Sequence, residues 1–241
     1  MTSLRRRKSR PAANRKPFAD TDPMFWMDLA IRFVLGVFFG VAAWVYFTNA
    51  LAQLLHAGPS QSIAMKAVSV LSMFAMAAFV LLIACLYAVR LRPVSKFAGW
   101  KATAAALLGA FLMWGLLFLE PRADLPVGFK LTSSALILIG NIYAIIALRH
   151  LGRSFSILPE GRALVTTGPY RFMRHPLYFA EFFATLGAAM VFWSWPAFLL
   201  FTAQVTMQFA RMHYEEKVLR ETFSGYAAYS RRTARVIPGI Y

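Results

Sequence analysis

The sequence predicts an all-α membrane protein with about six transmembrane helices and with both termini in the cytoplasm. Three observations lead to this fold class. Hydrophobic residues make up 59% of the 241 residues and charged residues only 15%, a balance typical of multi-spanning membrane proteins. Apolar windows long enough to cross a bilayer as helices recur along the chain. The basic residues gather between these windows, as they do beside membrane spans.

The elements follow from the apolar windows taken in order. Residues 1–24 are polar and basic with no apolar period, so we expect a disordered tail whose positive charges lie against anionic lipid headgroups. The first apolar window is too long for a cleaved signal peptide, so we interpret it as a retained span. Four windows, each near the about 20 residues that a spanning helix needs, cover Leu29–Leu51, Val68–Val89, Ala102–Leu119 and Leu131–Leu148.

The last two spans are predicted to form an antiparallel helical hairpin. The fifth runs from Leu177 to about Trp193, and the sixth runs from Ala197 towards Arg211. Only the turn Ser194-Trp195-Pro196 separates them. We therefore expect three N-terminal membrane helices within residues 25–130 and three more within residues 131–241.

The distribution of charge predicts the orientation. The net charge is +16, but 22 of the 26 lysines and arginines lie in residues 1–24, 90–101, 149–176 and 211–241, between or beyond the spans. This pattern argues against a nucleic-acid-binding face and for the positive-inside rule. The four basic segments are therefore assigned to the cytoplasm.

Several common kinds of site are not predicted. Cys85 is the single cysteine, so there is no disulfide framework, and we expect it to be a small buried residue. His150 and His213 lack metal-ligand spacing, so no metal is predicted. No Rossmann or P-loop motif is present. Gly36 and Gly40 would allow helix dimerisation and hence a homo-oligomer, although close packing within the bundle is the favoured explanation.

Residues 164–178, LVTTGPYRFMRHPLY, concentrate polar chemistry at a membrane edge. A Gly-Pro turn is followed by Tyr170, Arg174, His175 and Tyr178. These side chains suit a site that binds a charged water-soluble molecule beside a lipid-facing substrate. Arg171 is interpreted as an interfacial residue and is not assigned to the site.

The fifth span extends this polar cluster into the membrane. His175, Tyr178 and Glu181 are spaced i, i+3 and i+6, so they share a broad face of a helix that Pro176 can begin. A carboxylate at this depth is costly without a partner or a function. We therefore assign Glu181 to the substrate side of the site, the alternative being a structural hydrogen bond to a neighbouring span.

The sixth span presents a second polar face. Its members are spaced 4, 3 and 4 residues apart and are Gln204, Gln208, Arg211 and Glu215. A helix leaving the bilayer with an Arg–Glu pair would explain the last two. Two glutamines within an apolar helix favour a polar cavity instead, so Gln204, Gln208 and Arg211 are assigned to contact with the substrate.

Together these segments resemble the isoprenylcysteine carboxyl methyltransferase and phospholipid methyltransferase superfamily. The resemblance covers residues 148–240 and rests on GPYRFMRHPLY, RMHYEEKVL and YAAYSRRTARVIPGI. Its members are integral membrane enzymes that use S-adenosyl-L-methionine. The resemblance implies that Arg211 lies near the transferred methyl group and is catalytic with Glu215. It assigns cofactor binding to Gly168, Pro169, Tyr170, Arg174, His175, Tyr178, Glu215 and Glu216.

The resemblance implies a methyltransferase with a cytoplasmic site and a lipophilic acceptor, in a bacterial inner membrane or the endoplasmic reticulum. Arg211 favours carboxyl O-methylation of an isoprenylcysteine-like substrate, because a guanidinium can hold an anionic acceptor. Phospholipid amine N-methylation, with Glu215 or Glu181 as the base, and S-methylation of a small thiol are alternatives. Two other classes are an NADPH-dependent membrane reductase and a non-catalytic assembly factor with a decayed site.

Overall fold

The all-α prediction is confirmed. The computed structural model describes residues 23–56, 63–94 and 98–240, and this part of the chain contains helices and an isolated bridge but no strand. The long helices are α1 (Pro23–His56), α2 (Ile63–Val89), α3 (Trp100–Phe111), α4 (Val127–Leu151), α5 (Pro176–Phe192) and α6 (Trp195–Thr222). The short ones are η1 (Leu112–Phe118), η2 (Gly152–Ser154), η3 (Gly168–Arg171) and α7 (Tyr226–Ser230). The predicted tail over residues 1–24 lies almost wholly outside the described residues.

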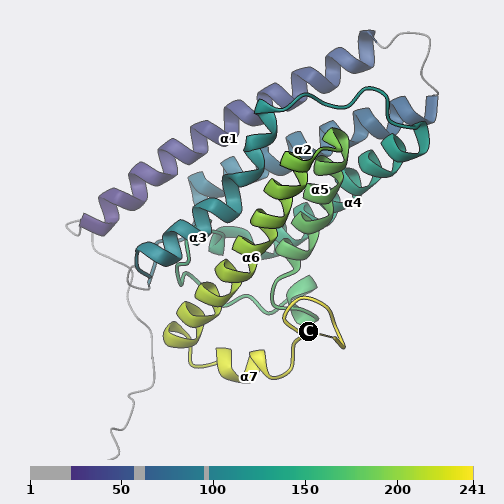
Figure 1. The fold of residues 1–241 in the computed structure, drawn as a ribbon. Helices are drawn as coiled ribbons and strands as arrows, with labels where there is room; N and C mark the ends of the chain where they lie inside the picture. The colour runs from purple at the N-terminus through teal and green to yellow at the C-terminus, as the bar shows by residue number, and fades with distance from the viewer. Residues whose placement is uncertain (1–22, 57–62, 95–97, 241) are drawn as a thin grey trace, which may run out of the picture.

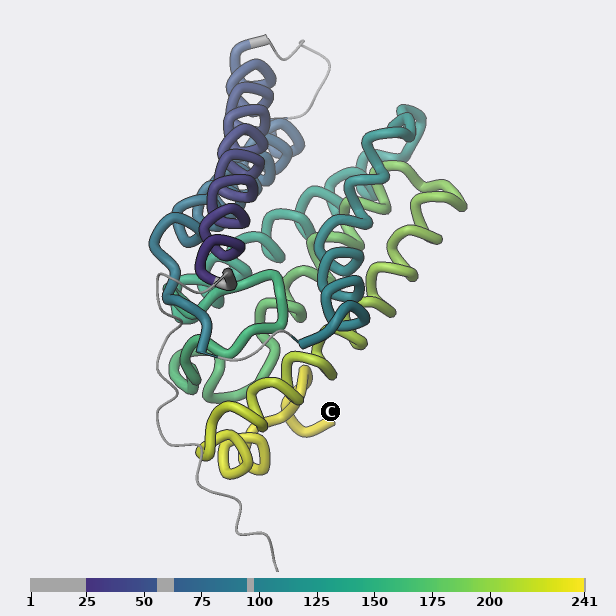
Figure 2. Tube along the Cα trace, turned by 90° about the vertical axis from the view of Figure 1, so that its left-hand side faces the viewer, coloured from purple at the N-terminus to yellow at the C-terminus, as the bar shows by residue number. Residues whose placement is uncertain are grey.

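The helices pack in two groups that meet along α5. Helix α1 lies along α2, α2 packs on α4, and α4 packs on α5, whereas α3 and η1 pack on α6. Figures 1 and 2 show α7 and the C-terminus beyond the end of the bundle at which α1 begins. The buried core is formed mainly by α1, α2, α4 and the segments before α5, and it includes Tyr87, Leu148, Phe155 and Tyr170.

Within the described residues, four helical segments are long and apolar enough to cross a membrane. They are Phe25–Leu55, Ile63–Val89, Trp100–Phe118 and Val127–Ser154, and Pro176–Phe192 is apolar but shorter. Large apolar side chains cover the outer surface of this bundle, for example on α1. The chain is therefore an integral membrane protein. The third segment tightens into the 3-10 helix η1 in its second half.

The predicted hairpin of the last two spans is formed by α5 and α6. Helix α5 ends at Phe192, and Trp193 adopts a left-handed conformation with φ of 40°. The side chain of Ser194 caps α6 by accepting a hydrogen bond from the Ala197 amide. Beyond Arg211 the helix continues without a break to Thr222, and it thereby carries its polar face out of the apolar bundle.

Two expectations about small residues are wrong. A Cβ atom added to Gly36 or Gly40 would meet nothing within 4 Å, so these glycines do not provide close packing within the described bundle. Cys85 is exposed on α2 and not buried. Close helix contact occurs instead at Gly140 on α4, where an added Cβ would lie 2.6 Å from the backbone nitrogen of Ala184 on α5. The sequence pattern detects small residues but does not show which helix face meets a neighbour.

Candidate active site

The loop before α5 is held in place by the C-terminal tail. Met173 and Ala234 form a parallel bridge. The backbone amides of Arg174 and His175 donate to the carbonyls of Ala234 and Arg235 over 2.9 and 3.1 Å. Pro176 then begins α5, as the sequence predicts, because a helix does not use the amide at that position. The RRTAR tail is therefore part of the site's framework.

Gly168 allows the turn that positions Tyr170. Its φ is +60°, which favours glycine, and an added Cβ would lie only 2.1 Å from Cδ2 of the His150 ring. Tyr170 follows with its side chain buried in the site. Burial raises the pKa of its phenol well above the ordinary value, so the hydroxyl is neutral and can donate a hydrogen bond.

The structure brings the two predicted polar faces together as three successive contacts between α5 and α6. Each residue of the His-Tyr-Glu face on α5 meets one polar residue of α6. The pairs are His175 Nε2 with Glu216 Oε1 at 3.0 Å, Tyr178 Oη donating to Glu215 Oε1, and Gln208 Nε2 donating to Glu181 Oε2. The periodicity of the sequence predicts each polar face separately. Which residues pair across the two helices depends on how α5 packs against α6, which the periodicity does not give.

Glu216 is surrounded by three basic side chains. Its Oε1 lies 3.0 Å from Arg174 Nε, 3.0 Å from His175 Nε2 and 3.3 Å from Arg235 Nε. Burial opposes ionisation, but the hydrogen bonds and charges of His175 and Arg174 outweigh it and lower the pKa of Glu216 to about 2. The carboxylate is therefore ionised at neutral pH and fixes the geometry around the start of α5.

Arg211 lies one helical turn before Glu215 and is 3% exposed. Its guanidinium lies 4.9 Å from the centre of the Tyr178 ring, within the range of a cation–π interaction. Its Nε is 3.3 Å from Glu215 Oε1 but makes no hydrogen bond within the described residues. Arg211 is thus a buried, oriented cation that retains capacity to donate to another group.

A polar cavity opens between the loop after α4, the start of α5 and the second half of α6. Six residues assigned to the site from the sequence line it, namely Tyr170, Arg174, His175, Tyr178, Arg211 and Glu215. Gly168, Pro169 and Glu216 lie outside this lining. Gly168 shapes the turn and Glu216 anchors the basic side chains. Arg174 is also held by the tail, because it donates to the carbonyls of Ser230 and Thr233.

Sequence reasoning missed one wall of the cavity. Residues 154–165 contribute Phe155, Ser156 and Glu160, and the C-terminal helix contributes Tyr226 and Tyr229. The YAAY motif was a usable signal for the two tyrosines, but nothing local marks the 154–165 wall. The hydroxyl of Tyr226 is buried and has no hydrogen-bond partner among the described residues.

A second, apolar cavity of about 280 Å³ lies deeper in the bundle. Residues from α1 to α6 line it, and its polar members are Tyr46, Asn141, Glu181, Thr185, Gln204 and Arg211. Gln204 donates to the carbonyl of Gly109 over 3.4 Å. Gln208 does not line the cavity itself but donates a hydrogen bond to Glu181, which does. Phe155 and Arg211 line both cavities. A charged and an apolar compartment therefore meet at one buried arginine.

Comparison with known proteins agrees with this geometry. Residues 129–225 match the family described as phospholipid methyltransferase, a segment that runs from α4 through α6 and carries most of the site. The chain is also similar to the cobalt-zinc-cadmium resistance protein CzcN of Cupriavidus metallidurans, with 34% identity over 84 residues. That similarity covers 33% of this chain and 37% of the relative, so the chain spans well under half of that protein's length. The family match confirms the resemblance seen in the sequence.

Proposed function

We propose that this chain, whose residues 129–225 match the phospholipid methyltransferase family, transfers a methyl group from S-adenosyl-L-methionine to a lipophilic acceptor. The observation that supports this most strongly is the junction of two cavities at Arg211 and Phe155. A polar compartment suits the charged cofactor and an apolar one suits a lipid-like acceptor. Two reactants held on either side of one residue are positioned for direct transfer.

The residues of the polar cavity suit this cofactor. When bound, S-adenosyl-L-methionine supplies an electrophilic methyl group on a sulfonium. Glu160 and Glu215 offer acceptors for an ammonium or for ribose hydroxyls, and His175 and Tyr170 offer donors for a carboxylate. The buried Tyr226 hydroxyl, which has no partner among the described residues, is a polar atom that a ligand would satisfy. Phe155 and the tyrosines supply aromatic faces for a base or a cation.

The role of Arg211 supports a carboxylate acceptor such as an isoprenylcysteine. Its guanidinium is buried at the junction and can hold an anionic group in line with the methyl donor. A carboxylate needs no strong base, so orientation and exclusion of water supply most of the acceleration. The cavity's apolar walls then hold the hydrocarbon part.

A second candidate is methylation of a phospholipid amine. Glu181 lines the apolar cavity and is hydrogen-bonded by Gln208, so a carboxylate faces the acceptor compartment. Such a group can orient an amine and take its proton. The orientation of the site follows from the basic segments and is proposed to be cytoplasmic.

Calorimetric titration with S-adenosylhomocysteine of the full chain in nanodiscs tests the cofactor site. Wild type should show saturable binding. His175→Ala should weaken it at least about tenfold, since a buried donor to the ligand is lost. His213→Ala, a matched change at an exposed position of α6, should leave affinity unchanged. Folded wild type that binds NADPH and not S-adenosylhomocysteine would overturn the proposal in favour of a reductase.

A further inference from the structure

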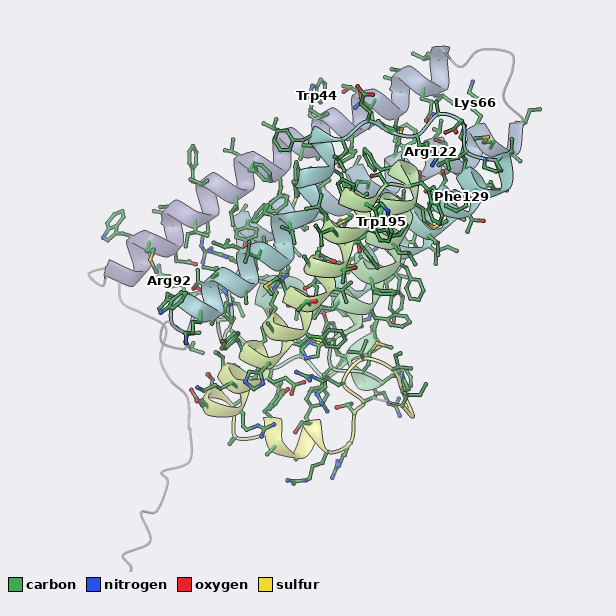
Figure 3. All side chains as sticks on the ribbon, in the orientation of Figure 1. Trp44, Lys66, Arg92, Arg122, Phe129 and Trp195 are labelled. Atoms are coloured by element: carbon green, nitrogen blue, oxygen red, sulfur yellow. The ribbon has the colours of Figure 1, made fainter. Side chains whose placement is uncertain are left out.

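The apolar cavity meets a further hollow at its end away from Arg211. Four residues line both spaces and form the boundary between them, namely Tyr46, Met76, Ala188 and Phe192. The further hollow, called the outer hollow here, also includes Arg122, which Figure 3 shows near the end of the bundle where α1 ends. The cavity that we assign to the acceptor therefore has defined residues at its far end.

The depth of the apolar cavity follows from the positions of its residues on α5. Arg211 contacts the Tyr178 ring, and Glu181 follows Tyr178 by one turn of this helix. From the rise of a helix per residue, Ala188 and Phe192 lie about 10 and about 16 Å beyond Glu181. This depth is roughly half of the ~30 Å hydrocarbon core of a bilayer. The cavity therefore has the length of a hydrocarbon tail that lies within one leaflet.

The two sides of the boundary differ in polarity. On the inner side the lining is mainly apolar, with members such as Phe39, Phe79 and Ile83. On the outer side, hydroxyl and amide side chains line the hollow, namely Gln53, Ser69, Ser72, Ser133 and Ser134. A hydrocarbon chain gains little by moving from lipid into an equally apolar cavity, and it loses free energy where it dehydrates polar groups. A chain that extends beyond the boundary is therefore disfavoured.

The boundary combines large side chains from two helices with a small one from a third. Tyr46 on α1 and Met76 on α2 both pack against the buried core, whereas Ala188 on α5 contributes only a methyl group. Tyr46 lies about 15 Å along α1 from His56, the last described residue of that helix. Truncating either large side chain would join the two spaces, and enlarging Ala188 would shorten the inner one.

We propose that Tyr46, Met76 and Ala188 determine the longest hydrocarbon chain that the methyl acceptor can carry. This inference rests on the proposed function, because it assigns the apolar cavity to the acceptor. Arg211 holds the head group at one end of the cavity and the boundary stops the chain at the other. Tyr46 and Met76 lie outside the residues 129–225 that match the family. The N-terminal helices thus set which acceptors fit.

Native mass spectrometry of the detergent-solubilised full chain tests this selectivity. The protein is titrated with N-acetylcysteine thioethers that carry a geranyl, a farnesyl or a geranylgeranyl chain. The readout is the ratio of geranylgeranyl to geranyl retention within one variant, because this ratio cancels differences in protein yield. Tyr46→Ala and, separately, Met76→Ala should each raise the ratio about tenfold above wild type. Ala188→Leu should lower it about tenfold, because the added carbons occupy the end of the cavity.

Two changes of the same size on the lipid-facing surface serve as controls. Phe47→Ala is adjacent to Tyr46 in the sequence, and Ala78→Leu lies on α2; both positions are exposed and line neither space. Each control should leave the ratio within about twofold of wild type. Thermal unfolding shows which variants are folded, and Met76→Ala carries the test if Tyr46→Ala is not.

A ratio that stays at the wild-type value in the folded boundary variants would overturn the proposal. So would a wild type that retains none of the three thioethers. Retention requires no methyl transfer, so the test separates this inference from the proposed function. If the ratios shift as expected but no label passes from S-adenosyl-L-methionine to the thioethers, the boundary sets chain length and the assignment of methyl transfer to such acceptors fails. If label is transferred while the ratios stay equal, the proposed function stands and the boundary does not set chain length.

Discussion

Arg211 combines three features that a lysine cannot reproduce together. It is buried, its planar guanidinium lies over the Tyr178 ring at 4.9 Å, and its Nε lies 3.3 Å from Glu215. A planar cation can stack on a ring and still donate in its own plane, whereas an ammonium is a point charge. If Arg211 orients the acceptor, its loss should affect turnover more than cofactor affinity.

Arg211→Lys is therefore expected to lower kcat by about a hundredfold while the Kd for S-adenosylhomocysteine changes by less than about threefold. Steady-state kinetics and calorimetry on the same preparation measure the two effects. Arg220→Lys, an exposed position on the same helix, serves as the control. An unchanged kcat would show that Arg211 does not act on the acceptor.

Gly168 carries two separate constraints, a positive φ and a close approach to His150. Gly168→Ala is expected to lower the free energy of unfolding by about 2–3 kcal/mol and to weaken S-adenosylhomocysteine binding. Gly152→Ala isolates the first constraint, because its φ is +52° and an added Cβ would meet nothing within 4 Å. It should cost about 1 kcal/mol. Thermal unfolding measures both, and equal effects would mean that contact with His150 is unimportant.

The lowered pKa of Glu216 predicts a dependence of stability on pH. Its folded pKa of about 2 lies below its ordinary value of 4.5. The ionised carboxylate therefore contributes stability that is present above pH 4.5 and is lost as the pH falls towards 2. Glu216→Gln should make the thermal unfolding midpoint less dependent on pH across that window. Glu221→Gln, a change at an exposed position, should leave this pH dependence as in wild type. Parallel curves for wild type and Glu216→Gln would contradict this account.

At the scale of elements, Asp28 joins helices that the sequence separates widely. Its carboxylate accepts hydrogen bonds from Arg90, which lies 62 positions later, and from Arg162, which lies 134 positions later. It thereby connects the start of α1 to the end of α2 and to the 154–165 wall of the polar cavity. Both arginine side chains are fully buried. Burying cations in this way is tolerable only while the counter-charge remains.

Asp28→Asn is expected to lower the free energy of unfolding by about 3–5 kcal/mol, because the buried guanidinium of Arg90 loses its counter-ion and that of Arg162 keeps only Glu160. Asp124→Asn provides the matched control, since it breaks an exposed pair with Arg122. That change should cost at most about 1 kcal/mol. The free energy of unfolding of both variants is measured by denaturation in the same nanodiscs and compared with wild type. If the two losses are similar, the Asp28 network does not hold α1 in place.

At the scale of the whole molecule, local patterns predict the elements well and their contacts poorly. The apolar windows locate every long helix, Pro176 marks the start of α5, and the spacing from His175 to Glu181 identifies a face. The partners of that face lie on α6, and periodicity within one helix does not reveal them. Asp28 lies just before the first apolar window, and two of its partners, Arg90 and Arg162, are remote arginines that the charge pattern assigns to loops. The wall at residues 154–165 has no periodic signal.

The two cavities involve the chain as a whole. Residues of the C-terminal half line the polar cavity, and residues of α1 to α6 line the apolar one. The most direct measurement is transfer of a labelled methyl group from S-adenosyl-L-methionine in membranes that contain the protein. The account predicts label in the lipid-soluble fraction with wild type and about a hundredfold less with Arg211→Lys. Folded wild type that binds the cofactor but transfers label only to water-soluble products, or equally with Arg211→Lys, would contradict it.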